Sequence, residues 1–161
     1  MALQSVVGLL GVAMVTGLIF AKFARAKARI AFSNSAVITM RDGMKSLIFR
    51  TANERENTII DASMKAVLTY IEVTPEEEPV RRFISPKLQR SETPMFVLTW
   101  QGTHPIDEHS PFFQMTAEDM AKAGADILVT VTGIDKDLAH PMQAAHTYEL
   151  RGLHPGVDCS S

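Results

Sequence analysis

The sequence has one cysteine and no charged side chain in its first 21 residues, and these absences narrow the class of protein. Cys159 is the single cysteine, so no disulfide can form within one chain, which fits a reducing compartment. No phosphate-cradling glycine loop, cysteine cluster or nucleophile beside a recognisable base is visible, so nothing indicates an enzyme. The net charge of −2 gives no reason to expect nucleic acid as a partner.

The uncharged stretch at the amino end predicts a transmembrane segment over residues 1–24. The run from Ala2 to Ala21 carries no charge, and roughly 20 helical residues at about 1.5 Å each cross the hydrocarbon core of a bilayer. A secretory signal would carry basic residues before the apolar run, whereas here they follow it. By the positive-inside rule, we expect one pass through the cell (inner) membrane, with everything after Lys22 in the cytoplasm. A plain anchor for a soluble domain is the open alternative.

Glycine and phenylalanine give this helix its candidate functional positions. Gly8, Gly11 and Gly17 lie inside it, and each glycine costs a helix about 1 kcal/mol relative to alanine. Close packing of neighbouring helices or a bending point would explain that cost, with neutral filler as the alternative. Phe20 lies at the expected cytoplasmic end, where aromatic rings commonly anchor a helix at the membrane interface.

A basic juxtamembrane linker is expected over residues 25–33. The basic residues of this region are Lys22, Arg25, Lys27 and Arg29. Each basic residue beside an anionic leaflet contributes about 1 kcal/mol of attraction. The cluster therefore predicts contact with lipid phosphates, and the simpler alternative is that these charges only fix which side of the membrane is inside.

After Phe32 the pattern predicts a mainly β domain over residues 34–161, an immunoglobulin-like sandwich with one short helix. The clearest strand is 59–73, where apolar residues alternate with polar residues that include Asp61. The short helix is expected to begin at the N-cap Thr116, with Asp119 at N3, and to stop at Gly124. The other expected strands are 36–40, 46–51, 95–100 and 126–132, with a turn at 41–43 and no assignment over 81–93.

The densest polar stretch runs from His104 to His109. Its two histidines flank Asp107 and Glu108, a combination that could bind a metal. The prolines at 105 and 111 favour a constrained structural turn instead, so we expect no metal site and no cofactor.

Several motifs in one register resemble the inward-rectifier potassium channel family, in a form closer to its bacterial branch. Residues 4–8 and 20–25 resemble the end of the family's inner, pore-lining helix. Ala36-Val37-Ile38 with Arg41-Asp42-Gly43, and Phe49-Arg50 with Asn53, resemble the first strands of its cytoplasmic domain. The most specific match is His104-Pro105-Ile106-Asp107-Glu108-His109-Ser110-Pro111.

The resemblance implies a homotetramer, or co-assembly with longer subunits, around a pore that conducts K⁺. It assigns a hydrophobic gate to Phe20 and contacts with anionic phospholipids, phosphoinositides among them, to the basic residues named above. It assigns attraction of Mg²⁺ and polyamines in the cytoplasmic pore to Asp61. Val12 and Thr132 stand where strong rectifiers carry acids, so weak block is expected. Membership of the voltage-gated channels is part of the same expectation.

Two departures from the family pattern bear on function. These residues contain no Thr-x-Gly-Tyr-Gly filter, whose carbonyl groups replace the hydration shell of K⁺, so the segment alone is not expected to select K⁺. From Leu150 to Ser161 the family pattern is lost, which predicts a sandwich that is incomplete at its carboxyl end. The first hypothesis is therefore a channel part that couples cytoplasmic and lipid signals to the gate. The alternative is a membrane-tethered β-sandwich that serves as an interaction module without a pore.

Overall fold

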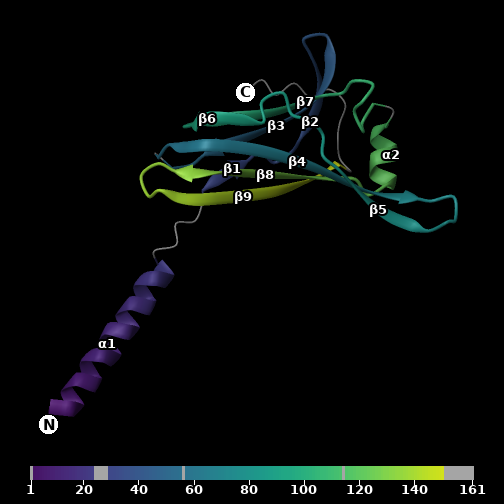
Figure 1. Cartoon of the computed structure of the whole chain (residues 1–161). Coiled ribbons are helices and arrows are strands. Elements are labelled where there is room, and N and C mark those ends of the chain that lie inside the picture. The colour runs from purple at the N-terminus through teal and green to yellow at the C-terminus, as the bar shows by residue number, and fades with distance from the viewer. Residues whose placement is uncertain (1, 24–28, 56, 114, 151–161) are drawn as a thin grey trace.

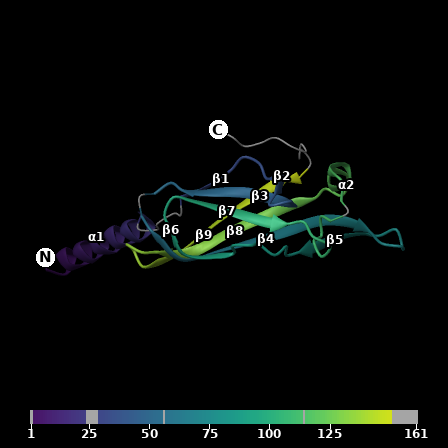
Figure 2. The ribbon, with the colours of Figure 1, turned by 90° about the horizontal axis from the view of Figure 1, so that it is seen from above.

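The computed structural model describes residues 2–23, 29–55, 57–113 and 115–150. Nine strands and two helices lie in these ranges, so the expectation of a mainly β fold is confirmed. The strands form two antiparallel sheets that lie face to face (Figure 1). Seen from above, the strands of both sheets run along the long direction of the domain (Figure 2).

The first sheet is built around β3 (Met44–Asn53). Strand β7 (Thr99–Pro105) pairs with one edge of β3, and β1 (Ile30–Phe32) and β2 (Val37–Arg41) pair one after the other with the opposite edge. The predicted turn joins β2 to β3 through Asp42 and Gly43, at φ 51° and 76°. Two consecutive positive φ values give the mirror-image turn whose twist matches that of a hairpin, which explains the Asp-Gly pair.

The second sheet is built around β4 (Ile59–Val73). Strand β8 (Asp126–Asp135) pairs with one edge of β4 and carries β9 (His140–Glu149) beyond it. Strands β5 (Pro79–Ile84) and β6 (Glu92–Phe96) share the opposite edge of β4. The strands β1, β5 and β9 were not predicted, and the sequence pattern had left 81–93 unassigned.

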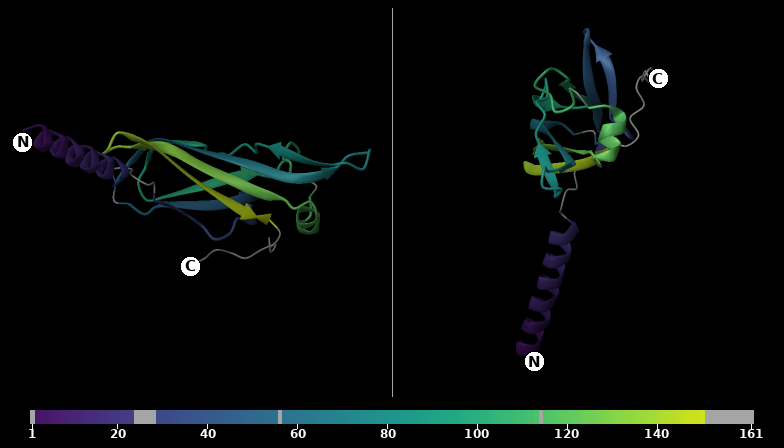
Figure 3. Two further views of the ribbon diagram at one scale, coloured as in Figure 1. Left: turned by 90° about the horizontal axis from the view of Figure 1, so that it is seen from below. Right: turned by 90° about the vertical axis from the view of Figure 1, so that its right-hand side faces the viewer.

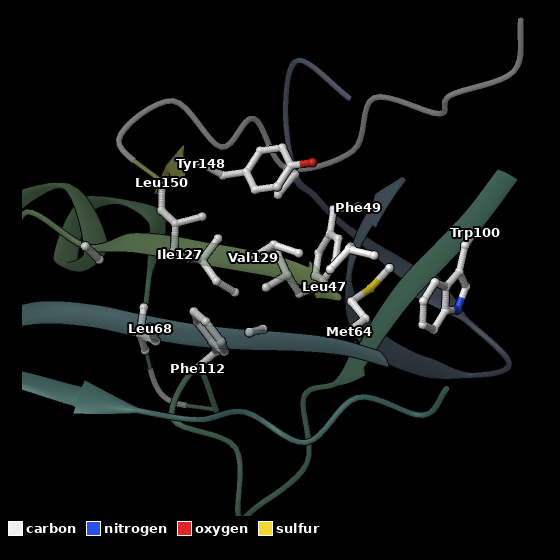
Figure 4. Close-up of a cluster of buried hydrophobic side chains, with 14 of the residues drawn as sticks. Leu47, Phe49, Met64, Leu68, Trp100, Phe112, Ile127, Val129, Tyr148 and Leu150 are labelled. Atoms are coloured by element: carbon white, nitrogen blue, oxygen red, sulfur yellow. The ribbon is translucent and has the colours of Figure 1, made fainter. Parts of the chain in front are cut away.

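The core lies between the two sheets. Leu47 and Phe49 of β3 face Ile127 and Val129 of β8, and each of the four is at most 1% exposed (Figure 4). The predicted alternation of β4 is confirmed, because Ala62, Met64, Ala66 and Leu68 are buried while Asp61 and Lys65 are exposed. Burial of one face of each sheet against the other makes the domain a two-layer sandwich.

The prediction of one strand over 95–100 is wrong. The chain bends at Val97 and Leu98, and Leu98 is 74% exposed. Strand β6 before the bend pairs with β4, whereas β7 after it pairs with β3, so the chain crosses here from one sheet to the other. The rings of Phe96 and Trp100 pack against each other on the core side of this crossing, with centroids 5.7 Å apart.

The short helix α2 (Ala117–Lys122) confirms the predicted boundaries. The Thr116 hydroxyl accepts from the backbone N–H of Asp119, and the Asp119 carboxylate accepts from the backbone N–H of Thr116. This reciprocal capping box satisfies amide groups that a helix start leaves unpaired. Gly124 follows the helix at φ 56°, a conformation that glycine adopts without strain.

Helix α1 (Ala2–Phe23) lies outside the sandwich (Figures 1 and 3). Its large apolar side chains between Val6 and Ile19 are 53–75% exposed. Among the residues that the structure describes, no helix meets the length and hydropathy needed to cross a membrane.

The carboxyl end of the described chain still contributes to the core. The side chain of Leu150 is fully buried, and its backbone N–H donates to the carbonyl of Ala125 at 3.1 Å. Leu150 therefore belongs to the folded sandwich. The predicted incompleteness of the sandwich concerns residues 151–161, which lie outside the described residues.

Candidate functional site

The candidate site is the outer, polar face of the β4–β8 sheet, and Asp61 lies at its most irregular point. The register between β4 and β8 shifts by one residue between Ile60 and Ser63, which marks a β-bulge. Asp61 has a φ of 48°, a left-handed conformation that aspartate tolerates better than most residues. Bulges re-aim side chains out of a regular ladder. Here the bulge presents Asp61 on the exposed side of the sheet.

A glycine across the ladder makes room for this bulge. Gly133 of β8 lies opposite the extra residue of β4. A Cβ atom at Gly133 would lie 2.5 Å from Cγ2 of Ile59 and 3.2 Å from the carbonyl oxygen of Ile60. A larger residue at position 133 would therefore push the two strands apart and change the position of Asp61.

The surroundings of Asp61 hold a second carboxylate that the sequence did not reveal. Asp61, Ser63 and Glu92 line one open hollow of about 410 Å³. Glu92 belongs to β6, where it pairs directly with Ser63 of β4. No local pattern could have placed Glu92 here, because only the long-range pairing of β6 with β4 brings it beside Asp61.

Thr132 lies in the same row of side chains. Its hydroxyl group is 3.1 Å from that of Ser63, the residue it faces across the β4–β8 ladder. The family resemblance had marked Thr132 as the replacement of an acid, and the structure places it two residues from Asp61 across the sheet. Lys65, in the next row, adds one positive charge to this face. Around Asp61 this face therefore presents the carboxylates of Asp61 and Glu92 with the hydroxyl groups of Ser63 and Thr132, and the ammonium group of Lys65 follows in the next row.

The predicted packing glycines have no partner within the described chain. A Cβ atom at Gly8, Gly11 or Gly17 would meet nothing within 4 Å. The positions are thus open on the surface of α1, and close packing against another helix stays a prediction.

The gate and the lipid-binding residues fall largely outside the described residues. Phe20 and Lys22 lie in α1, but their side chains are not among those described, and Arg25 and Lys27 lie outside the described ranges. Arg29 is described and is exposed. Its carbonyl accepts from the backbone N–H of Glu54 at 2.9 Å, which fixes the start of β1 against the end of β3.

The histidine at the end of β7 has a structural role. His104 is 4% exposed, with Nδ1 2.7 Å from the carbonyl oxygen of Lys87 and Nε2 2.8 Å from the Ser110 hydroxyl. A carbonyl can only accept, so Nδ1 donates and Nε2 accepts from Ser110. Both ring nitrogens are thereby occupied, which supports the structural turn over a metal ligand. Within the described ranges no three potential metal ligands come together.

Comparison with known proteins decides the family. The model of the inward rectifier potassium channel C-terminal domain matches residues 30–156. The chain belongs to this family. The match extends past Leu150, so the expected loss of the family pattern from that residue is wrong.

Three relatives support the family membership. The inward rectifier potassium channel Kirbac3.1 of Paramagnetospirillum magnetotacticum is 38% identical over 91% of this chain and 50% of its own length. The ATP-sensitive inward rectifier potassium channel 8 of Homo sapiens is 31% identical over 91% of this chain and 36% of its own. The ATP-sensitive inward rectifier potassium channel 12 of Mus musculus is 32% identical over 90% and 36%. The chain thus spans half or less of the length of these relatives.

One matching solved structure has much lower sequence identity. The sporulation control protein Spo0M of Bacillus subtilis matches at 8% identity and a TM-score of 0.34, over 76% of this chain and 48% of that one.

Family membership bears on two further expectations. Inward rectifier potassium channels are not voltage-gated, so the expected membership of the voltage-gated channels is wrong. The family is not enzymatic, which agrees with the lack of any indication of catalysis in the sequence.

Proposed function

We propose that the chain is part of an inward-rectifier potassium channel, in which it lines the inner pore and couples cytoplasmic and lipid signals to a gate at Phe20. In this proposal residues 1–24 cross the membrane and the sandwich lies in the cytoplasm. Four copies, or copies together with longer subunits, surround the ion path. The filter that selects K⁺ is supplied by a part of the channel outside these residues.

The observation that carries the proposal is the outer face around Asp61. A carboxylate on an exposed bulge, beside Glu92 and two hydroxyl groups, gives a polar and acidic surface on a rigid sheet. Such a surface raises the local concentration of cations, because fixed negative charge focuses the field in a confined path. K⁺ would pass it, and Mg²⁺ or a polyamine would dwell there longer because of its higher charge.

The exposed apolar surface of helix α1 supports the proposal that residues 1–24 cross the membrane. Large apolar side chains between Val6 and Ile19 that are more than half exposed are costly in water. Neighbouring helices and lipid would cover them, and glycines at open positions would let those helices approach closely.

A chimeric channel tests the proposal. Residues 2–161 would replace the matching half of Kirbac3.1, which supplies its own filter, and outward K⁺ current would be recorded with and without spermine. We expect K⁺ conduction with weak block, and Asp61→Asn should remove most of that block. Asp42→Asn is the matched control, because Asp42 is also an exposed aspartate at positive φ but lies in the β2–β3 turn. Deep block would contradict the expected weak rectification, and equal effects of both variants would refute the role of Asp61.

A second variant tests whether Glu92, which β6 brings beside Asp61, also acts on the ion path. Glu92→Gln removes the second carboxylate of the hollow without changing its size. If both acids face the ion path, Glu92→Gln should weaken the remaining block as well. An unchanged block would restrict the role to Asp61.

Assembly and lipid binding need their own measurements. Native mass spectrometry of the full chain in detergent should give a tetramer; a monomer would favour the alternative of a tethered interaction module. Replacement of Lys22, Arg25, Lys27 and Arg29 by glutamine should weaken binding to vesicles that contain phosphoinositides.

In the chimera, Phe20→Ala should raise the open probability, because four small side chains no longer exclude water from the crossing of the inner helices. An unchanged open probability would remove Phe20 from the gate.

A further inference from the structure

Strands β1 and β9 belong to different sheets, but four side chains join them. The ring of Phe32 on β1 stacks on that of His146 on β9, with centroids 5.4 Å apart and an angle of 19° between the ring planes. The hydroxyl oxygen of Tyr148, also on β9, lies 3.2 Å from that of Ser33, which follows β1. The ring of Tyr148 meets that of His146 edge to face, with centroids 4.6 Å apart. We call these four residues the β1–β9 contact.

The β1–β9 contact is a second attachment for a short strand. Strand β1 has three residues, and its ladder with β3 consists of three pairs, from Ile30–Asn53 to Phe32–Thr51. A short strand opens at a low free-energy cost, because few hydrogen bonds have to break. Strand β1 is also the element that follows α1 along the chain. The contact therefore affects how firmly the start of the sandwich is held to the second sheet.

His146 can take up a proton without losing a hydrogen bond to the described chain. Both ring nitrogens of the buried His104 are occupied by Lys87 and Ser110, whereas within the described ranges no such partner is found for the ring nitrogens of His146. The side chain of His146 is partly exposed, so water can reach it. Histidine ordinarily changes its charge between about pH 5 and pH 8. A charge change of His146 therefore acts on the two aromatic rings that it touches.

Within the described ranges, the side chains that face His146 carry no charge. The residue opposite it on β8 is Val129, and the residue opposite Phe32 on β3 is Thr51. Burial raises the pKa of Tyr148 above its ordinary value of 10.0, so the phenol stays neutral where histidine titrates. The charged residues that flank the contact along these strands are all exposed: Arg29, Arg50, Glu54 and Glu149.

We propose that protonation of His146 strengthens the β1–β9 contact, so that β1 is held more firmly as the pH falls. A protonated imidazole on the face of Phe32 forms a cation–π pair, which adds electrostatic attraction to the stacking of the neutral rings. Loss of the proton leaves the stacking and the contact between Tyr148 and Ser33, but removes the cationic part. The inference concerns the fold alone and does not depend on a role of the chain in ion conduction.

Hydrogen exchange of the full chain in detergent tests this proposal. The protection of the β1 amides would be measured at about pH 7.5 and about pH 5.5, on either side of the range in which histidine titrates. At each pH the wild type is compared with His146→Gln, so that the intrinsic pH dependence of exchange cancels. We expect the ratio of wild-type to variant protection to be about two- to fivefold higher at the lower pH. An equal ratio at both values, or a higher ratio at the higher pH, would overturn the proposal.

Three further variants make the test specific. His140→Gln is the matched control, because His140 is an exposed histidine of the same strand outside the contact, and it should leave the protection of β1 unchanged. Phe32→Leu keeps an apolar side chain but removes the aromatic face, so it should abolish the pH dependence, whereas Phe32→Tyr should retain it. A full pH dependence in Phe32→Leu would assign the effect to another group. Loss of the pH dependence in both variants would assign it to packing at residue 32, and either result would overturn the proposal.

Discussion

Helix α1 and the β-sandwich treat apolar side chains in opposite ways. The helix leaves its described apolar residues 53–75% exposed, whereas Leu47, Phe49, Ile127 and Val129 in the sandwich are at most 1% exposed. Glycine shows the same contrast, since Gly11 has open space around it and Gly102 lies against Phe49 and Met64.

This difference separates the part of the chain that buries its own core side chains from the part that does not. The sandwich buries the inner faces of its two sheets against each other, and its own residues complete its hairpin turn and the start of α2, while single apolar side chains such as Leu98 and Phe83 stay exposed. The described apolar side chains of α1 stay exposed, which fits the proposed assembly with other subunits. Substitutions of the same kind in the two regions should therefore have different consequences.

The largest difference is expected for truncation of an apolar side chain. Phe49→Ala should lower the free energy of unfolding by about 3–5 kcal/mol, because it leaves a cavity between β3 and the facing sheet. Leu10→Ala should leave the stability of the sandwich unchanged, since Leu10 is 60% exposed in α1. Denaturant unfolding followed by Trp100 fluorescence measures both. Equal losses would mean that the two regions unfold as one unit.

Glycine-to-alanine substitutions should have effects of opposite sign on the stability of the two regions. A Cβ at Gly102 would lie 2.3 Å from Cε2 of Phe49 and 2.8 Å from the sulfur of Met64, so Gly102→Ala should destabilise the sandwich by about 1–3 kcal/mol. A Cβ at Gly11 meets nothing within 4 Å, so Gly11→Ala should strengthen the helix by up to about 1 kcal/mol. Denaturant unfolding measures the first effect, and far-UV circular dichroism in detergent the second. A loss of helicity in Gly11→Ala would show that the glycine is needed for packing against another helix.

The features that the sequence predicts are those controlled by neighbours along the chain. The alternation in β4, the Asp-Gly turn and the cap of α2 each depend on a few consecutive residues, and the structure confirms all three. Strand β1 was missed because its partner β3 lies further along the chain, with Ile30 opposite Asn53. Strand β9 forms a hairpin with the neighbouring β8, and it was missed because its sequence begins with His-Pro and contains adjacent alanines, which are poor strand formers. The break at Val97 and Leu98 was missed because an apolar run reads as one strand whether or not the chain changes sheets in the middle.

The candidate site follows the same division. The polar side of β4 predicted that Asp61 is exposed, but not that it lies on a bulge at positive φ. The bulge depends on Gly133, and the second carboxylate depends on β6, and both reach Asp61 only through sheet pairing. The gate and most of the basic cluster lie beyond the described side chains, so those assignments stay predictions from the family resemblance.

A smaller effect separates the two helices. Helix α2 begins with a capping box, whereas α1 has no acidic residue in its first turn. Thr116→Ala should cost about 1 kcal/mol of stability, because an amide at the start of α2 loses its acceptor and Met120 is buried beneath the helix. Thr116→Ser keeps the acceptor and serves as the control in the same denaturant experiment. An equal loss in both variants would attribute the effect to packing rather than to the cap.

The smallest expected effect is a pH dependence of the stability, and it comes from Asp119, the second partner in the capping box of α2. The hydroxyl of Thr116 donates to the Asp119 carboxylate and, together with the backbone N–H of Thr116, lowers the pKa of Asp119 below its ordinary 3.8. A lowered pKa in the folded state stabilises the fold above the unfolded value of 3.8, and this contribution is lost as the pH falls through the lower, folded-state value. Asp119→Asn should therefore be less stable than the wild type at neutral pH, with a gap that closes as the pH falls below 3.8. Unfolding across that range, with Glu118→Gln as the control from the same helical turn, measures the gap; a gap that is constant with pH would assign the effect of Asp119 to side-chain shape rather than to charge.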